Sequence, residues 1–178
     1  MKYSLGAVVL HWLIGILIAM NIGIAWRAED LPKPLQLEVY GYHKAWGILI
    51  LLLVVLRIVW RLTHTPPPLS PGLKTWEAGL AKAVHSLLYV LMLAIPLAGW
   101  ALHSAFSGGK PVSVFGLFSF PGLPFAADKA RGELFAEIHG TLATVLFALV
   151  ALHVLGSLKH QFLDRDGNLR RMWFGRGL

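Results

Sequence analysis

Histidine is the residue type with which this sequence can do chemistry. The chain has eight His and no Cys, which excludes disulfides, zinc–thiolate sites, iron–sulfur clusters and covalently attached c-type haem. Imidazole nitrogens are therefore its strongest metal ligands. Four of them belong to His11, His43, His139 and His153, which lie inside long apolar stretches. An ionisable group in such a stretch is costly and is a mark of function.

The spacing of these His residues is informative. His139 and His153 are 14 residues apart, which on a helix returns them to nearly the same face with a rise of about 21 Å. One helix can thus offer one ligand to each of two centres. The residue four positions after each of the four His is small, as a porphyrin lying over a helix requires: Gly15, Gly47, Ala143 and Ser157. Small residues are also common where membrane helices pack.

The composition predicts that the elements carrying these His residues cross a membrane. Of the 178 residues, 56% are hydrophobic and 14% are charged, whereas soluble domains carry roughly 25% charged residues. A soluble enzyme and a disordered chain are thereby excluded. Stretches of bilayer-spanning length predict four spans in one domain covering 1–178, at about 5–26, 40–60, 80–103 and 134–158. The first apolar stretch is too long for a signal peptide.

Polar segments rich in Pro and Gly connect the predicted spans. The run 65–72 contains four Pro residues, and no helix crosses it. The stretch 104–129 is expected to be a long loop, whose Phe residues predict a position on the membrane interface. Pro96 lies inside the third span, where neighbouring helices satisfy the freed carbonyl.

Lys and Arg are distributed unequally between the two sides of the predicted membrane. With four spans both termini share a side, and that side carries ten of the 16 basic residues but three of the nine acidic ones. The positive-inside rule then predicts that both termini are cytoplasmic. The net charge of +7 suggests nucleic acid in a soluble protein. Here it indicates topology, and no nucleic-acid partner is expected.

In this orientation the four His residues fall on two levels. His11 and His153 lie near the cytoplasmic ends of their spans, and His43 and His139 lie near the outer ends. One pair at each level is what two bis-His haems stacked across a bilayer need. One alternative for each His is an imidazole hydrogen-bonded to a neighbouring helix. Another is zinc, which prefers four ligands, and neither level offers four within the spans.

Further polar residues are predicted near the inner level. His85 begins the third span, where Tyr89 one turn later would block a porphyrin, and His160 follows His153 by seven residues. We expect His85 and His160 to be proton donors where a quinone headgroup is reduced, or to contact lipid headgroups. The residues expected beside them as substrate contacts are Arg61, Lys82 and Lys159.

Arg57 and the two remaining His residues complete the candidate set. Arg57 is 14 residues after His43, so it shares the face of that residue at the inner level. It is predicted to pair with a haem propionate, and the alternative is an Arg that extends to the membrane surface. His64 and His103 lie at span ends and are expected at the surface.

The ordered set of motifs resembles the bacterial cytochrome b-561 family, and the likeness covers nearly the whole chain. The motifs are His11-Trp12, the segment 42–47 around His43, His85, Ile138-His139-Gly140 and Leu152-His153. The resemblance implies an all-α protein of the bacterial inner membrane, a four-transmembrane-helix bundle enclosing two b-type haems. His11 and His153 would ligate the inner haem, and His43 and His139 the outer haem.

The resemblance also implies a function. Stand-alone members are similar to superoxide oxidase, which passes electrons from superoxide to ubiquinone, and His85 and His160 would match the quinone side. The outer side carries six basic and six acidic residues, so a positive field that speeds capture of the anion must be local, around Lys33 with Lys44 or Lys110. Two alternatives stay open. One is a cytochrome b subunit that anchors a protein redox partner, such as a hydrogenase or formate dehydrogenase. The other is a non-redox His-lined metal or proton transporter.

Overall fold

Four long helices dominate the computed structural model, which describes residues 2–68 and 73–174. They are α1 (Leu5–Glu29), α2 (Lys33–Thr63), α3 (Thr75–Ser107) and α4 (Lys129–Lys159). In the described part of the chain these four helices are long and apolar enough to cross a membrane. The four predicted spans are therefore confirmed, and the chain is a multi-pass membrane protein. The end of the Pro-rich run, 69–72, and Arg176 of the charge count lie outside the described residues.

Three of the four helices, α2, α3 and α4, extend well beyond the predicted spans, and capping residues rather than hydropathy mark several of the helix ends. Ser4 Oγ accepts a hydrogen bond from the Ala7 amide at the start of α1. Asp128 accepts from the Arg131 amide at 2.9 Å at the start of α4. Gly108 ends α3 with a φ of 69°, a left-handed conformation that Gly adopts without steric cost.

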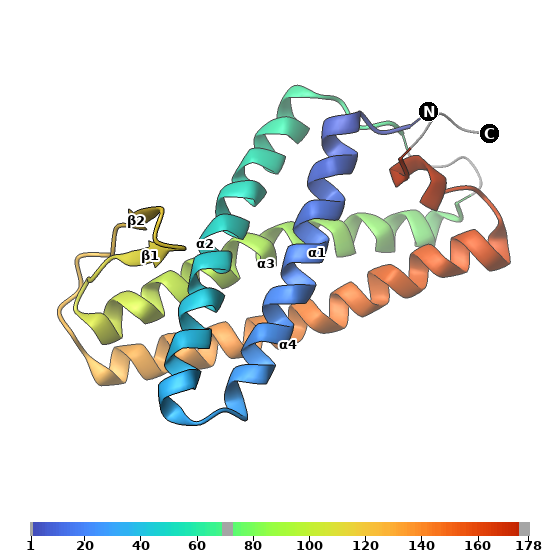
Figure 1. Cartoon of the computed structure of the whole chain (residues 1–178). Helices are drawn as coiled ribbons and strands as arrows, with labels where there is room; N and C mark the ends of the chain where they lie inside the picture. Colours follow the sequence, from blue (N-terminus) through green and yellow to red (C-terminus); the bar gives the residue numbers. More distant parts are fainter. Residues whose placement is uncertain (1, 69–72, 175–178) are drawn as a thin grey trace.

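The helices form two hairpins that cross each other (Figure 1). α1 packs chiefly on α2, and α3 packs chiefly on α4. The first and last described residues lie where α1 and α3 begin and where α2 and α4 end, which we call the termini end (Figure 1). The opposite end, with the α1–α2 and α3–α4 connections, is called the loop end.

A small β-hairpin lies in the α3–α4 connection, within the stretch predicted as a loop. Strand β1 (Val112–Val114) pairs with the antiparallel strand β2 (Phe118–Phe120). The side chains of Val112 and Val114 are buried against Ala45 and Ile48 of α2. The hairpin is therefore packed on the helix that carries His43, next to that residue.

The buried core joins all four helices, but α4 contributes least to it. The core cluster comprises Leu10, Ile14, Leu17, Ile50, Val54, Leu91, Met92 and Leu146. Of the described residues of α4, Gly132 and Leu146 are buried, and α4 makes few close backbone contacts with α1 or α2. The helix with two of the four candidate His ligands thus stands apart from the hairpin that carries the other two.

Candidate functional site

His43 and His139 face each other near the loop end. Their ring centroids are 6.0 Å apart with the planes inclined at 83°. Nδ1 of His43 lies 3.1 Å from the backbone oxygen of Asn21, and Nδ1 of His139 lies 2.9 Å from that of Ile95. Because a carbonyl oxygen only accepts, Nδ1 carries the proton in both rings, and Nε2 keeps its lone pair for a metal.

His11 and His153 form a second facing pair toward the termini end. Their ring centroids are 6.1 Å apart, with an interplanar angle of 73°. Arg57 from α2 donates from Nη2 to His11 Nδ1 at 3.1 Å. The ring of His85 lies 5.2 Å from that of His153. The structure thus brings together the two predicted pairs, and it adds a third imidazole beside the second pair.

Both pairs fit two axial ligands of a haem iron. An imidazole nitrogen binds a metal at about 2 Å, so two rings on opposite sides of one ion have centroids about 6 Å apart, as observed here. A Cβ added at Gly15 or Gly140 would meet no atom within 4 Å, and one at Gly47 would meet only the Asn21 amide nitrogen at 3.9 Å. The helix surfaces beside the rings are therefore open enough for a flat macrocycle.

Two residues at the His43–His139 pair were not predicted from the sequence. A Cβ on Gly99 of α3 would lie 3.0 Å from Cε1 and 3.1 Å from Nδ1 of His139, so Gly99 makes room for that ring. Asn21 is 8% exposed, and its Oδ1 has no hydrogen-bond partner among the described residues. A lone Asn in an apolar span is a visible signal, whereas nothing distinguishes Gly99 from other glycines in a membrane helix.

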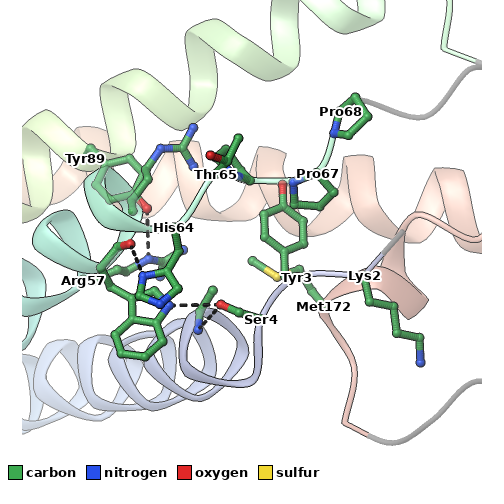
Figure 2. Close-up of a pocket in the computed structure, with 14 residues that line it drawn as sticks. Lys2, Tyr3, Ser4, Arg57, His64, Thr65, Pro67, Pro68, Tyr89 and Met172 are labelled. Carbon is green, nitrogen blue, oxygen red and sulfur yellow. Dashed lines mark hydrogen bonds between the residues drawn. The ribbon is translucent and has the colours of Figure 1, made fainter.

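A pocket of about 520 Å³ opens beside the second pair at the termini end (Figure 2). Arg57 lines it and donates from Nε to the Tyr89 hydroxyl at 3.1 Å. The guanidinium carbons of Arg57 and Arg61 both lie 5.4 Å from the centre of the Tyr89 ring, within cation–π range. Trp60 and His64 stack at 4.1 Å on another wall. The pocket therefore combines positive charge with aromatic surface.

The predicted quinone-side residues fall into two groups. His85 and Arg61 lie near the second His pair and the pocket. His160 and Lys159 belong to a carboxylate cluster where α4 ends. Lys82 is exposed on α3. The structure therefore does not bring all five residues into the single cluster that was expected.

The two His residues expected at the surface differ in exposure. His64 is exposed, although its ring stacks on Trp60. His103 is half-buried and its Nε2 lies 3.1 Å from the Lys110 backbone oxygen, so it helps to hold the start of the β-hairpin connection.

A four-helix membrane bundle with facing imidazole pairs at two levels defines a class of integral membrane haem protein. The sequence pattern of prokaryotic cytochrome b561 matches residues 2–175. The chain belongs to this family, and it is thus an electron-transfer membrane protein that binds b-type haem.

Individual relatives agree with this assignment. The chain is 31% identical to cytochrome b561 homolog 2 of Escherichia coli (strain K12) over 173 residues, covering 96% of this chain and 90% of that protein. It is 30% identical to the probable superoxide oxidase CybB of Yersinia pestis over 177 residues, covering 96% and 95%. It is 29% identical to cytochrome b561 homolog 1 of Escherichia coli (strain K12) over 174 residues, with 96% of each chain covered.

Proposed function

We propose that this protein is a dihaem superoxide:ubiquinone oxidoreductase of a bacterial inner membrane. The observation that carries the proposal is the presence of two facing imidazole pairs. The ring centroids are 6.1 Å apart in the His11–His153 pair and 6.0 Å apart in the His43–His139 pair. His11 and His153 hold one haem b, and His43 and His139 hold the other. The similarity to a probable superoxide oxidase over 96% of this chain supports the choice of substrate.

The overall reaction balances with two superoxide anions for each quinone. Each superoxide gives up one electron and leaves as dioxygen, and ubiquinone takes two electrons and two protons to become ubiquinol. Haem supplies the one-electron chemistry, with potentials set by the ligands and their surroundings. The protein must therefore hold the ligands, admit an anion at one end and supply protons at the other.

Backbone carbonyls orient the His43–His139 pair for this task. The Asn21 and Ile95 carbonyls accept from the Nδ1 atoms, which turns the Nε2 atoms toward the shared centre and raises their basicity. Lys44 directly follows His43 and is half-buried. It is the basic side chain best placed to attract superoxide to this level.

Arg57 has a different role at the other pair. A His that binds iron through Nε2 carries its proton on Nδ1, so it cannot also accept there from a guanidinium. Binding of haem at His11 therefore requires Arg57 to leave the Nδ1 contact it makes in this structure. Its charge is then available to a propionate, with the Tyr89 hydroxyl as its second partner.

The termini end is the proposed quinone side. His85 and His160 are the proton donors, and Arg61, Lys82 and Lys159 are the basic side chains that attract the reduced, electron-rich headgroup. The proposed orientation has both termini in the cytoplasm, where protons for the quinone are taken up. The surplus of basic residues at this end supports it.

Haem counting and rapid mixing test the proposal. Purified protein is expected to contain two b-type haems per chain, and His43→Ala and His139→Ala are each expected to lose the same one. His64→Ala, an exposed His outside both pairs, is the matched control and keeps both. One haem per chain, or different haems lost in the two variants, would contradict the pairing.

The substrate is tested with the same preparation in a stopped-flow instrument. Mixing with superoxide is expected to reduce the haems, and adding a short-chain ubiquinone is expected to reoxidise them with formation of ubiquinol. Failure of superoxide to reduce the haems would overturn the donor. Reduced haems that ignore quinone would overturn the acceptor.

A further inference from the structure

Asn21 is a polar residue on a buried and otherwise apolar face of α1. This face passes through Leu10, Ile14 and Leu17 to Asn21, and it continues at Ala28. Residues that recur every three or four positions form a single stripe along a helix, and here the stripe is the one that packs into the bundle. Asn21 therefore occupies a position where the pattern predicts an apolar side chain.

The side chain of Asn21 is buried without a partner for its oxygen. In the described part of the chain, three polar or charged residues are buried: Asn21, Glu77 and Ser104. Glu77 pairs with Lys159, and Ser104 donates from Oγ to the Trp100 carbonyl at 2.8 Å. Asn21 Oδ1, in contrast, has no hydrogen-bond partner among the described residues. Because an unpartnered buried polar atom costs stability, packing alone does not account for this amide.

The amide nitrogen of Asn21 lies beside the face of α2 that carries His43. A Cβ added at Gly47 would meet only Asn21 Nδ2, at 3.9 Å. Gly47 is one helical turn after His43, so the two residues share a face of α2. The donor end of the amide therefore borders the open helix surface that a macrocycle bound to His43 needs.

The main chain of Asn21 contacts the same imidazole. Its carbonyl oxygen lies 3.1 Å from His43 Nδ1 and accepts the proton of that ring. One residue thus approaches this site twice, with a carbonyl that orients the ring and with a side-chain amide one turn deeper along α2. His11, the ligand candidate at the other level, is ten residues away, which is about 15 Å along α1. An effect of the amide is therefore exerted chiefly on the His43–His139 pair.

An unpaired amide acts strongly on a nearby charge in a dry interior. Its N–H end carries partial positive charge, and the low dielectric constant inside a membrane bundle screens that charge poorly. Haem iron between two neutral imidazoles has one more positive charge when it is oxidised than when it is reduced. A positive N–H end beside such a group disfavours the oxidised form, so it raises the reduction potential.

We propose that Asn21 raises the reduction potential of the haem held by His43 and His139, through the side-chain N–H that borders their site. This role rests on the proposed function. Superoxide loses one electron and leaves as dioxygen, that electron converts ferric to ferrous iron, and no bond at Asn21 forms or breaks. The amide favours the reduced state because its donor end is in place before the electron arrives. Electron uptake is thereby favoured at the loop end, where the donor is proposed to react.

A redox titration of the purified protein, followed by haem absorbance, tests the proposal. The component that His43→Ala removes is assigned to this site. Asn21→Leu replaces the amide with an apolar group of similar shape. It is expected to make reduction of that haem about tenfold less favourable, which lowers its potential by about 59 mV for one electron. Asn21→Ala removes the amide without adding bulk and is expected to shift the potential in the same direction. The other haem should titrate as in the wild type.

Met20→Leu is the matched control, because Met20 precedes Asn21 on α1 and is 36% exposed, and it should leave both potentials unchanged. Haem content shows whether each variant is assembled. An unchanged or higher potential in either assembled Asn21 variant would overturn the role of Asn21 and leave the proposed function standing. Loss of this haem from both variants would assign Asn21 to haem retention and overturn the proposal. A wild type without a haem that depends on His43 would overturn the proposed function as well.

Discussion

At the scale of single residues, the environment of each imidazole distinguishes the two His pairs. His43 and His139 contact backbone carbonyls through Nδ1. These carbonyls belong to the main chain, so side-chain substitutions do not remove them, and they fix the tautomer of each ring. His11 instead contacts a charged side chain, Arg57. The first pair is thus oriented by the main chain, whereas under the proposed ligation the second pair binds haem only after the Arg57 side chain leaves His11 Nδ1.

Gly99→Ala tests how strictly the His139 ring is positioned. The new methyl group would lie 3.0 Å from Cε1 of the imidazole, so the ring must move, at a cost of about 1–3 kcal/mol. We expect lower occupancy of the haem that His43 and His139 are proposed to bind, together with an altered low-spin electron paramagnetic resonance signal. Gly23→Ala is the control, because a Cβ there meets no atom within 4 Å. Equal haem content in both variants would contradict the role of Gly99.

The sequence allowed the four His residues of the pairs to be singled out, but not all of their surroundings. Their level in the membrane follows from position within a span, and a spacing of 14 residues gives a common helix face. The approach of His85 to His153 depends on how α3 is rotated against α4, which no local pattern specifies. Arg61 on α2 lines the pocket, whereas Lys159 on α4 pairs with Glu77. This division also depends on how the helices are placed against one another.

At the scale of elements, hydropathy predicted the spans well and the connections poorly. The strands β1 and β2 have three residues each, too few for an alternating pattern to be distinguished from an aromatic interfacial loop. The hairpin is stabilised by tertiary packing, because Val112 and Val114 are buried against α2. At its turn, Phe115 and Gly116 adopt positive φ.

Val114→Ala tests whether this hairpin supports the His43 level. Val114 is 2% exposed, and removing buried methyl groups is expected to cost about 2 kcal/mol. We expect the haem bound by His43 to be lost at a lower temperature, measured by its absorbance during heating. Leu117→Ala lies in the same hairpin but is 83% exposed, so it should leave the melting temperature unchanged. Equal shifts in the two variants would separate the hairpin from the haem site.

At the scale of the whole molecule, the unequal distribution of charge is the basis of the proposed orientation of the bundle. The sequence alone predicts four spans and an even topology, and the structure agrees because the first and last described residues lie at one end of the bundle (Figure 1). The side of the membrane that this end faces is inferred from the ten basic residues counted there. Lipid headgroups on the cytoplasmic leaflet are anionic and retain such residues.

Reporter fusions test this orientation. A green fluorescent protein joined to the carboxyl terminus is expected to fluoresce, because it stays in the cytoplasm, and alkaline phosphatase at the same place is expected to be inactive. The same phosphatase inserted at Gly116 in the β-hairpin should be active. The opposite pattern would invert the assignment of the quinone side and the superoxide side.

The division of the facing pairs between the two helical hairpins has a consequence for biogenesis. Each pair takes one ring from the α1–α2 hairpin and the other from α4, so neither hairpin alone holds a complete pair. Under the proposed ligation, a nascent chain with only α1 and α2 in the membrane holds one ligand for each haem and no complete pair. The same ligation predicts that stable haem binding follows insertion of α4, so that haem absorbance would mark the completion of membrane assembly.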